Sequence, residues 1–449
     1  MIYTKLFGQC IAALILSSVM CYTEPQASNS TIAEEIRAWR KLKYGMFIHY
    51  SLSTFDGKEQ TPGSSTPVSI HKPTELDVDQ WIRVAKESGM KYAVLTAKHS
   101  SGFCLWDSKV QWKSKEFDYD VAASPVATDV VAEFMTACEK YGIVPGIYYC
   151  TMDTRHSDKK IKWTPSLPYI SNDYFQLMKD HLTELHTKYP SIKIQWIDIP
   201  RHLTLGQRTT LYNLVRNLSP PCLILYNYGQ ESRDISEYTI KTAMKVSWPS
   251  DILNSEITPI KKPFKNQQEY KGQTYELAYE HCISLDKGGW FWDGKSKPRS
   301  LENLTSVYKQ SLNLNGNFLL NVPPDKTGKI PEAFVQRLSE LKSSLGLVNI
   351  HSSFNQSGNN TDIEFNVSKK YTHPHSHCVM ITFDIHEYDH SILKICNILG
   401  QETAILVNGY KAGGKHTMTW QPKGIPGGTY FVRLQTGTFS KIKKIILQN

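Results

Sequence analysis

The 449-residue sequence lacks the features that would mark a membrane, metal or nucleotide-dependent protein. Beyond the N-terminus, no stretch approaches the ~18 uninterrupted apolar residues of a transmembrane helix, so no membrane partner is expected. No cysteines show CxxC spacing and no His, Asp and Glu residues show ligand spacing, so no metal is expected. Phosphate-loop and dinucleotide fingerprints are also missing, and we expect no cofactor. The net charge of +9 is modest and scattered, and so no nucleic-acid partner is expected.

The N-terminus has the form of a secretory signal peptide. Lys5 precedes an apolar stretch from Cys10 to Met20, and small and polar residues follow it. We therefore predict a signal peptide over residues 1–27 and an exported protein, with extracellular, periplasmic and lysosomal destinations all open. A lipid anchor on Cys21 is disfavoured, because no small residue precedes this cysteine. Sequons predict a glycoprotein if the host glycosylates; they begin at Asn29, Asn217, Asn303, Asn355, Asn359 and Asn366.

Seven cysteines remain after removal of that peptide. They are Cys104, Cys138, Cys150, Cys222, Cys282, Cys378 and Cys396. An odd number without paired spacing leaves any disulfide pairing undetermined. Most of them lie within apolar strand or helix patterns, so we expect small buried thiols.

Short apolar strands alternate with amphipathic helices along most of the chain. One example is the strand-like run at 91–100, which the helical pattern 127–141 and the strand-like run 144–150 follow. Asp129 near the start of that helical pattern and Gly142 after it are typical helix boundaries. Some eight such units over about 300 residues predict an α/β fold, a (β/α)8-like TIM barrel, rather than an open sheet. We assign it residues 28–349.

The pattern changes from about residue 350. A polar, Gly- and Asn-rich stretch at 351–360 has a composition typical of a linker. Short strand-like runs separated by Gly and Pro turns follow, without helical periodicity. These predict a C-terminal all-β sandwich over residues 350–449. It contains no catalytic constellation.

Polar and aromatic residues follow many of the predicted barrel strands. They are His49, His99, Tyr148, Tyr149, Asp198, Glu256, Glu280, Trp290 and Trp292. Catalytic groups of such barrels lie at the carboxyl ends of the strands, so these side chains are expected to converge. Aromatic faces and hydrogen-bonding groups suit a sugar, and a pair of carboxyl groups is what acetal hydrolysis requires. Each residue alone has an ordinary structural explanation; for Asp198 it is helix capping or pairing with Arg201.

Five segments, in the same order, resemble glycoside hydrolase family 29, the α-L-fucosidases. They are "KYGMFIHYS", "YAVLTAKHSSGFCLWDS", "DVVAEFMTACEKYGIVPGIYY", "QWID" and "NLNGNFLLNVPPDKTGKIP". The resemblance covers roughly residues 32 to 347. It implies a (β/α)8-like barrel followed by a β-sandwich, a retaining mechanism, and a fucosylated glycan as the substrate. The oligomeric state is not implied.

The resemblance also implies roles for the two carboxyl groups. It makes Asp198, at the end of the fourth strand, the nucleophile that forms a glycosyl-enzyme. The acid/base is first assigned to Glu256 in "SWPSDILNSEITP". Glu280 in "YEHC" and Glu237 in "DISEY" stay open as alternatives. For Glu280, an indirect role in orienting substrate or acid also stays open.

The same resemblance implies the sugar-binding residues. His49 and His99 should hydrogen-bond fucose hydroxyls, and Trp106 and Tyr149 should line the pocket. A tryptophan of "GGWFW", assigned as Trp290, should pack on the sugar's methyl group, and Glu280 is assigned to substrate binding. These six residues and the catalytic pair Asp198 and Glu256 form the predicted site.

The sequence departs from the family pattern at several contacts. Ser100 and Ser101 in "KHSSGF" replace a second His and an Asp, "FIHYS" replaces the usual His-Trp-Gly, and a common Arg is not evident in "LYNYGQES". Two alternatives to a secreted exo-α-L-fucosidase therefore stay open. One is a catalytically degenerate barrel that binds fucosylated glycans, and the other is a barrel glycosidase acting on another deoxy sugar.

Overall fold

The computed structural model of the chain describes residues 30–157, 170–227, 247–347, 365–373, 376–385, 389–397, 402–422, 424–436 and 439–447. The predicted signal peptide, the predicted linker and Glu237 lie outside these ranges.

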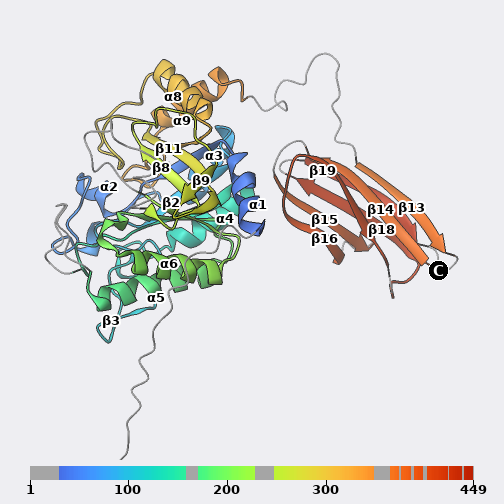
Figure 1. The fold of residues 1–449 in the computed structure, drawn as a ribbon, viewed down its shortest axis with the longest axis horizontal. Coiled ribbons are helices and arrows are strands. Elements are labelled where there is room, and N and C mark those ends of the chain that lie inside the picture. Colours follow the sequence, from blue (N-terminus) through green and yellow to red (C-terminus); the bar gives the residue numbers. More distant parts are fainter. Residues whose placement is uncertain are drawn as a thin grey trace, which may run out of the picture.

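Eight parallel strands form a closed barrel (Figure 1). Around the ring their order is β1 (Tyr44–Ile48), β12 (Asn317–Asn321), β11 (Ala278–Ser284), β8 (Ile252–Glu256), β7 (Leu223–Tyr226), β6 (Ile194–Asp198), β5 (Val144–Cys150) and β2 (Tyr92–Lys98). The first and last of these strands in the chain pair with each other, Tyr44 opposite Phe318, and this pairing closes the ring. The predicted (β/α)8-like barrel is confirmed.

Helices follow most strands. They are α1 (Ser30–Arg40), α2 (Leu52–Asp56), α3 (Val78–Glu87), α4 (Val130–Tyr141), α5 (Asn172–Lys188), α6 (Leu205–Leu218), α8 (Leu301–Asn313) and α9 (Glu332–Ser344). The boundaries predicted for α4 are confirmed: the Asp129 carboxylate accepts a hydrogen bond from the Ala132 amide, and Gly142 ends the helix at φ 64°. None of the described helices is both long and apolar enough to span a bilayer.

Within the ranges given above, two small hairpins and three 3₁₀ turns interrupt the alternation. The hairpins pair β3 (Gln111–Trp112) with β4 (Lys115–Glu116) and β9 (Gln267–Tyr270) with β10 (Gln273–Glu276). The 3₁₀ turns are η1 (Val68–Ile70), η2 (Val121–Ala123) and η3 (Pro200–His202). The first hairpin lies in the connection between β2 and α4, at the end of the barrel where strands finish.

The barrel strands are buried on both faces, and their side chains alternate between two cores. Every residue of β5 is buried. Tyr148 belongs to the core inside the barrel with Phe47 and Trp196, whereas Tyr149 belongs to the core between the strands and the helices. Because side chains alternate with a period of two, neighbouring residues on one strand enter different environments. This parity decides which residues reach the site.

The C-terminal strands form two antiparallel sheets that share one core. One sheet has the order β13 (Phe365–His373), β14 (Ser376–Ile385) and β17 (Gly414–Trp420). The other has the order β16 (Glu402–Lys411), β15 (Asp389–Asn397), β18 (Gly428–Thr436) and β19 (Phe439–Leu447). Ile381, Leu393 and Val432 from the two sheets pack together and are fully buried. The predicted all-β sandwich is confirmed.

The cysteines with described side chains carry no disulfide. Five are buried thiols: Cys104, Cys138, Cys150, Cys222 and Cys282. Cys396 is half-buried on the sandwich. The expectation of small buried thiols is confirmed for the five in the barrel.

Candidate active site

Two carboxyl groups meet where three neighbouring strands end. Asp198 is the last residue of β6, and Glu256 is the last residue of β8. Between them, Asn227 follows β7, and its backbone amide donates to Ile197 O at 2.9 Å. Strand order alone therefore sets the asparagine between the acids.

The side chain of Asn227 connects the pair. Its Nδ2 donates to Asp198 Oδ1 at 2.8 Å and also to Glu256 Oε1. Its Oδ1 accepts from Asn254 Nδ2 at 3.0 Å, which fixes the orientation of the amide. Because both carboxyl groups contact one nitrogen, they lie close together, as the short carboxyl separation of retaining glycosidases (~5–5.5 Å) requires.

The surroundings of Glu256 favour its protonated form. Burial, the charge of Asp198 and, more weakly, the charge of Glu59 together raise its pKa to about 8, against the lowering effect of the Asn227 hydrogen bond. A carboxyl group with this pKa is protonated at neutral pH and can donate a proton.

Asp198 is held as an acceptor by two donors. Besides the asparagine, the Tyr148 phenol donates to Asp198 Oδ2 at 2.6 Å. This bond is short, so it orients the carboxyl group firmly. Within the pair, one group is therefore a fixed acceptor and the other holds a proton.

The two predicted histidines lie beside the pair. His49 follows β1, and its Nδ1 contacts Asn321 Oδ1 at 2.8 Å. His99 follows β2, and its ring stacks on Tyr148 with centroids 5.7 Å apart, so it lies one ring away from Asp198. Burial is the main cause that lowers both pKa values, to about 3 for His99 and well below 6.5 for His49. Both imidazoles are neutral and can donate and accept hydrogen bonds.

An aromatic segment after β11 covers these histidines. The Trp290 ring stacks on His49 at 5.2 Å, and Phe291 packs edge-on against His49 at 5.3 Å and His99 at 4.9 Å. The Glu59 carboxylate accepts from the Trp290 backbone amide at 3.0 Å. The apolar edge of the site is thus fixed by a carboxylate from the first βα connection.

Three predicted residues do not reach the pair. Tyr149 points outward from β5, where its hydroxyl contacts His181 Nδ1 at 3.0 Å. Trp106 is fully buried and donates from Nε1 to Glu184 Oε2 on α5 at 2.7 Å. Both pack in the core between strands and helices rather than inside the barrel. Their contacts support the walls that carry the site.

Glu280 is the third, and it lies deeper inside the barrel. The residue of β11 opposite Glu256 is Cys282, so Glu280 is two residues below the rim. Its carboxyl oxygens accept from Tyr92 Oη at 2.8 Å and Trp196 Nε1 at 2.9 Å, and only 1% of the residue is exposed. Burial raises its pKa to about 7.

Three residues that lie at the site were not among the predicted residues. They are Asn227, Phe291 and Glu59. Tyr148 was named with the residues at the strand ends but was not assigned to the site, although strand parity could have chosen it: it lies opposite Trp196, which is two residues before Asp198 and on the same face. Asn227 also follows a predicted strand and could have been found. No sequence signal connects Glu59 with a loop 231 residues away.

Two regions of the chain match models of known protein families. Residues 66–346 match the family model described as alpha-L-fucosidase, and residues 369–448 match the model described as secretion system C-terminal sorting domain. The second match suggests that the chain is secreted or exported to the cell surface.

Curated relatives carry the same family description. Alpha-L-fucosidase 1 of Arabidopsis thaliana is 32% identical over 320 residues, which are 68% of this chain and 59% of that protein. The plasma alpha-L-fucosidase of Homo sapiens is 23% identical over 357 residues, or 70% of this chain and 68% of that protein. The chain spans between 54% and 59% of the length of the first three relatives it matches.

Solved structures share the fold. A putative alpha-L-fucosidase from Bacteroides thetaiotaomicron superposes with a TM-score of 0.57 at 21% identity, covering 94% of this chain and 98% of that one. The alpha-L-fucosidase AlfC from Lactobacillus casei, solved with its alpha-L-fucose product, superposes with a TM-score of 0.54 at 22% identity, covering 70% of this chain and 98% of that one.

Proposed function

Because the chain belongs to the α-L-fucosidase family, we propose that it is an exported, retaining exo-α-L-fucosidase that removes terminal α-L-fucose from glycans. The observation that carries this proposal is the pair of carboxyl groups on Asn227. Asp198 is held as an acceptor, and burial with the neighbouring charge keeps Glu256 protonated.

In the first step, Asp198 is the nucleophile. One of its oxygens forms a bond to the anomeric carbon of fucose while the bond from that carbon to the glycosidic oxygen breaks. Glu256 donates its proton to the departing oxygen, so the aglycone leaves as a neutral alcohol. The enzyme then holds a glycosyl ester on Asp198 and a carboxylate on Glu256.

In the second step, the carboxylate of Glu256 removes a proton from water. The water oxygen forms a bond to the anomeric carbon as the ester bond to Asp198 breaks. Two displacements at one carbon restore the α-configuration of the released fucose. Tyr148 and Asn227 stabilise the charge that returns to Asp198.

The sugar is bound by the aromatic end of the barrel. Neutral His49 and His99 exchange hydrogen bonds with fucose hydroxyls, and Trp290 and Phe291 supply apolar contacts for the C–H face and the methyl group. Ser100 stands where the family commonly has a second histidine. Its hydroxyl forms a hydrogen bond with His99 Nδ1 at 3.1 Å, so this position still contacts a sugar-binding residue.

The proposal is tested by hydrolysis of an aryl α-L-fucoside. We expect turnover by the wild type, loss in Asp198→Gly, and rescue by azide with β-fucosyl azide as the product. Glu280→Gln is the matched control, since it changes a buried carboxyl group outside the pair, and its product should keep the α-configuration. A wild type that shows no turnover but gains thermal stability from fucose would favour the non-catalytic fucose-binding barrel.

A further inference from the structure

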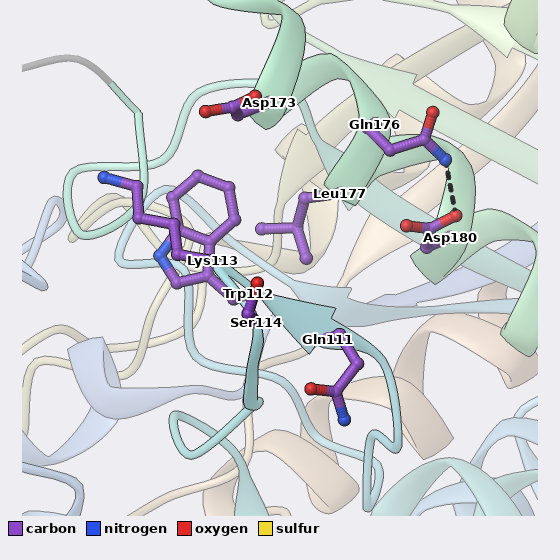
Figure 2. A pocket seen from close by; sticks show the side chains of 8 residues that line it. All are labelled: Gln111, Trp112, Lys113, Ser114, Asp173, Gln176, Leu177 and Asp180. Carbon is purple, nitrogen blue, oxygen red and sulfur yellow. Dashed lines mark hydrogen bonds between the residues drawn. The ribbon is translucent and has the colours of Figure 1, made fainter.

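A cavity lies on the flank of the barrel, between the β3–β4 hairpin and helix α5 (Figure 2). Its volume is about 490 Å³, within the ~300–1,000 Å³ range of small-molecule sites. The lining residues are Gln111, Trp112, Lys113, Ser114, Asp173, Gln176, Leu177 and Asp180. None of them belongs to the site described above.

The lining combines one aromatic wall with hydrogen-bonding groups. Trp112 is half-buried and Leu177 is buried, whereas the amides and carboxylates are polar and reach solvent. Gln176 donates to Asp180 at 2.7 Å, which places an amide and a carboxylate side by side on α5. An indole next to amide and carboxylate acceptors matches the C–H face and the hydroxyls of a pyranose.

Other ligand classes fit this cavity less well. Two carboxylates, Asp173 and Asp180, face one ammonium, Lys113, so a phosphate, sulfate or sialic acid is repelled more than it is attracted. Among the described residues, no His, Cys, Asp and Glu set could hold a metal ion. One indole alone does not form the aromatic cage that binds quaternary ammonium groups.

The hairpin turn presents the tryptophan to this cavity. Lys113 and Ser114 form the turn with φ values of 50° and 62°, the left-handed conformation of a two-residue hairpin loop. The Lys113 ammonium lies over the indole at 5.1 Å. Because that lysine is exposed and cation–π contacts at exposed sites are weak, a sugar can displace it.

The cavity lies at the same end of the barrel as the catalytic pair. The β3–β4 hairpin belongs to the connection that begins with His99, and Asp173–Asp180 form the first half of α5. A helix that follows a barrel strand starts near the carboxyl end of that strand.

A contact chain connects the two sites. Trp112 packs edge-on against His156 at 5.5 Å, and His156 Nδ1 lies 3.0 Å from Asp153 Oδ2. Asp153 pairs with buried Lys98 at 3.2 Å, and Lys98 precedes His99.

We propose that this cavity is an accessory carbohydrate subsite that binds a neutral sugar unit of an extended glycan, stacked on Trp112. The role in substrate choice rests on the proposed fucosidase function, since it implies that extended neutral glycans are bound more tightly than simple fucosides. The binding of a neutral sugar itself does not depend on catalysis.

The kinetic test compares an aryl α-L-fucoside with a neutral fucosylated oligosaccharide. Trp112→Ala should raise KM for the oligosaccharide about three- to tenfold, the effect of losing one aromatic contact, and leave the aryl fucoside unchanged. Trp112→Phe keeps an aromatic ring, so its KM for the oligosaccharide should stay close to the wild-type value. Lys309→Ala on α8 is the control substitution at an exposed residue outside the cavity. Equal changes for both substrates, or no change for either, would overturn the proposal.

A binding test separates this proposal from the catalytic one. Saturation-transfer NMR on the full chain would use N-acetyllactosamine, which has no fucose, and its sialylated form. We expect transfer to the neutral sugar that disappears in Trp112→Ala and is weaker for the sialylated sugar. No transfer to the wild type, undiminished transfer in Trp112→Ala, or a preference for the sialylated sugar would overturn the subsite, even if aryl fucoside is hydrolysed.

Discussion

The hydroxyl of Tyr148 donates a 2.6 Å hydrogen bond to Asp198 Oδ2 across neighbouring barrel strands. The same ring packs against Trp196 at 5.9 Å and against His99 at 5.7 Å. The phenol therefore joins the predicted nucleophile to the barrel core and to the sugar-binding wall. It orients the carboxylate, and its rigid ring limits how far that group can move.

Tyr148→Phe should lower kcat/KM for an aryl α-L-fucoside about 10- to 100-fold. The variant keeps the ring and removes one hydrogen bond to a charged group, which is worth about 1.5–3 kcal/mol. Steady-state kinetics at pH 6 would measure the loss. Tyr149→Phe is the matched control, because its hydroxyl contacts His181 outside the barrel interior. Equal losses in the two variants would show that the bond to Asp198 has no special role.

Activity should fall as pH rises through about 8. The first step needs protonated Glu256, and its pKa of about 8 places the loss of that proton on the basic side. The Asp198 charge contributes to that shift, so Asp198→Asn should lower the pKa of Glu256. NMR titration of ¹³C-labelled glutamate would follow both proteins. An unchanged pKa in the variant would show that the two carboxyl groups do not interact.

Glu256 and Glu280 should respond differently to leaving-group chemistry. Glu256→Ala should slow fucosides with poor leaving groups far more than aryl fucosides with good ones, since only the former need a proton. Glu280→Gln should affect both alike and destabilise the fold by about 1–3 kcal/mol, because Tyr92 and Trp196 donate to different oxygens of Glu280 and the amide nitrogen that replaces one of them cannot accept. Hydrolysis rates for a series of fucosides with different phenol leaving groups would measure the leaving-group dependence, and thermal melts would measure the loss of stability. The reverse pattern would make Glu280 the acid.

Lys98→Met should destabilise the fold by about 3–5 kcal/mol. Lys98 and Asp153 are both fully buried, and Lys98 Nζ also donates to Cys150 O at 3.0 Å. The variant therefore removes the buried cation that is paired with the Asp153 carboxylate, which keeps only its contacts with His156 Nδ1 and two backbone amides. Lys188→Met is the control, since its ion pair with Asp129 is solvent-accessible and worth at most about 1 kcal/mol. Urea unfolding would compare the two. Similar small effects would show that Asp153 is compensated by other groups.

The sequence by itself determined the architecture and several of the residues at the carboxyl ends of the barrel strands. Strand and helix periods differ, so the alternation of the two patterns defined the barrel, and the change of pattern near residue 350 separated the sandwich. Asp198 closes an apolar strand, and a charge at that place is informative because barrel strands end at a common rim. His49 and His99 were found by the same reasoning.

Only the tertiary structure decided which neighbours these residues have. Parity around a closed ring brought Tyr148 inward and Tyr149 outward. Register placed Glu256 at the rim and Glu280 two residues deeper, although both glutamates lie within barrel strands. Glu59 meets Trp290 across 231 residues. Such contacts depend on strand stagger and loop closure, which are set by packing of the whole barrel and leave no local pattern in the sequence.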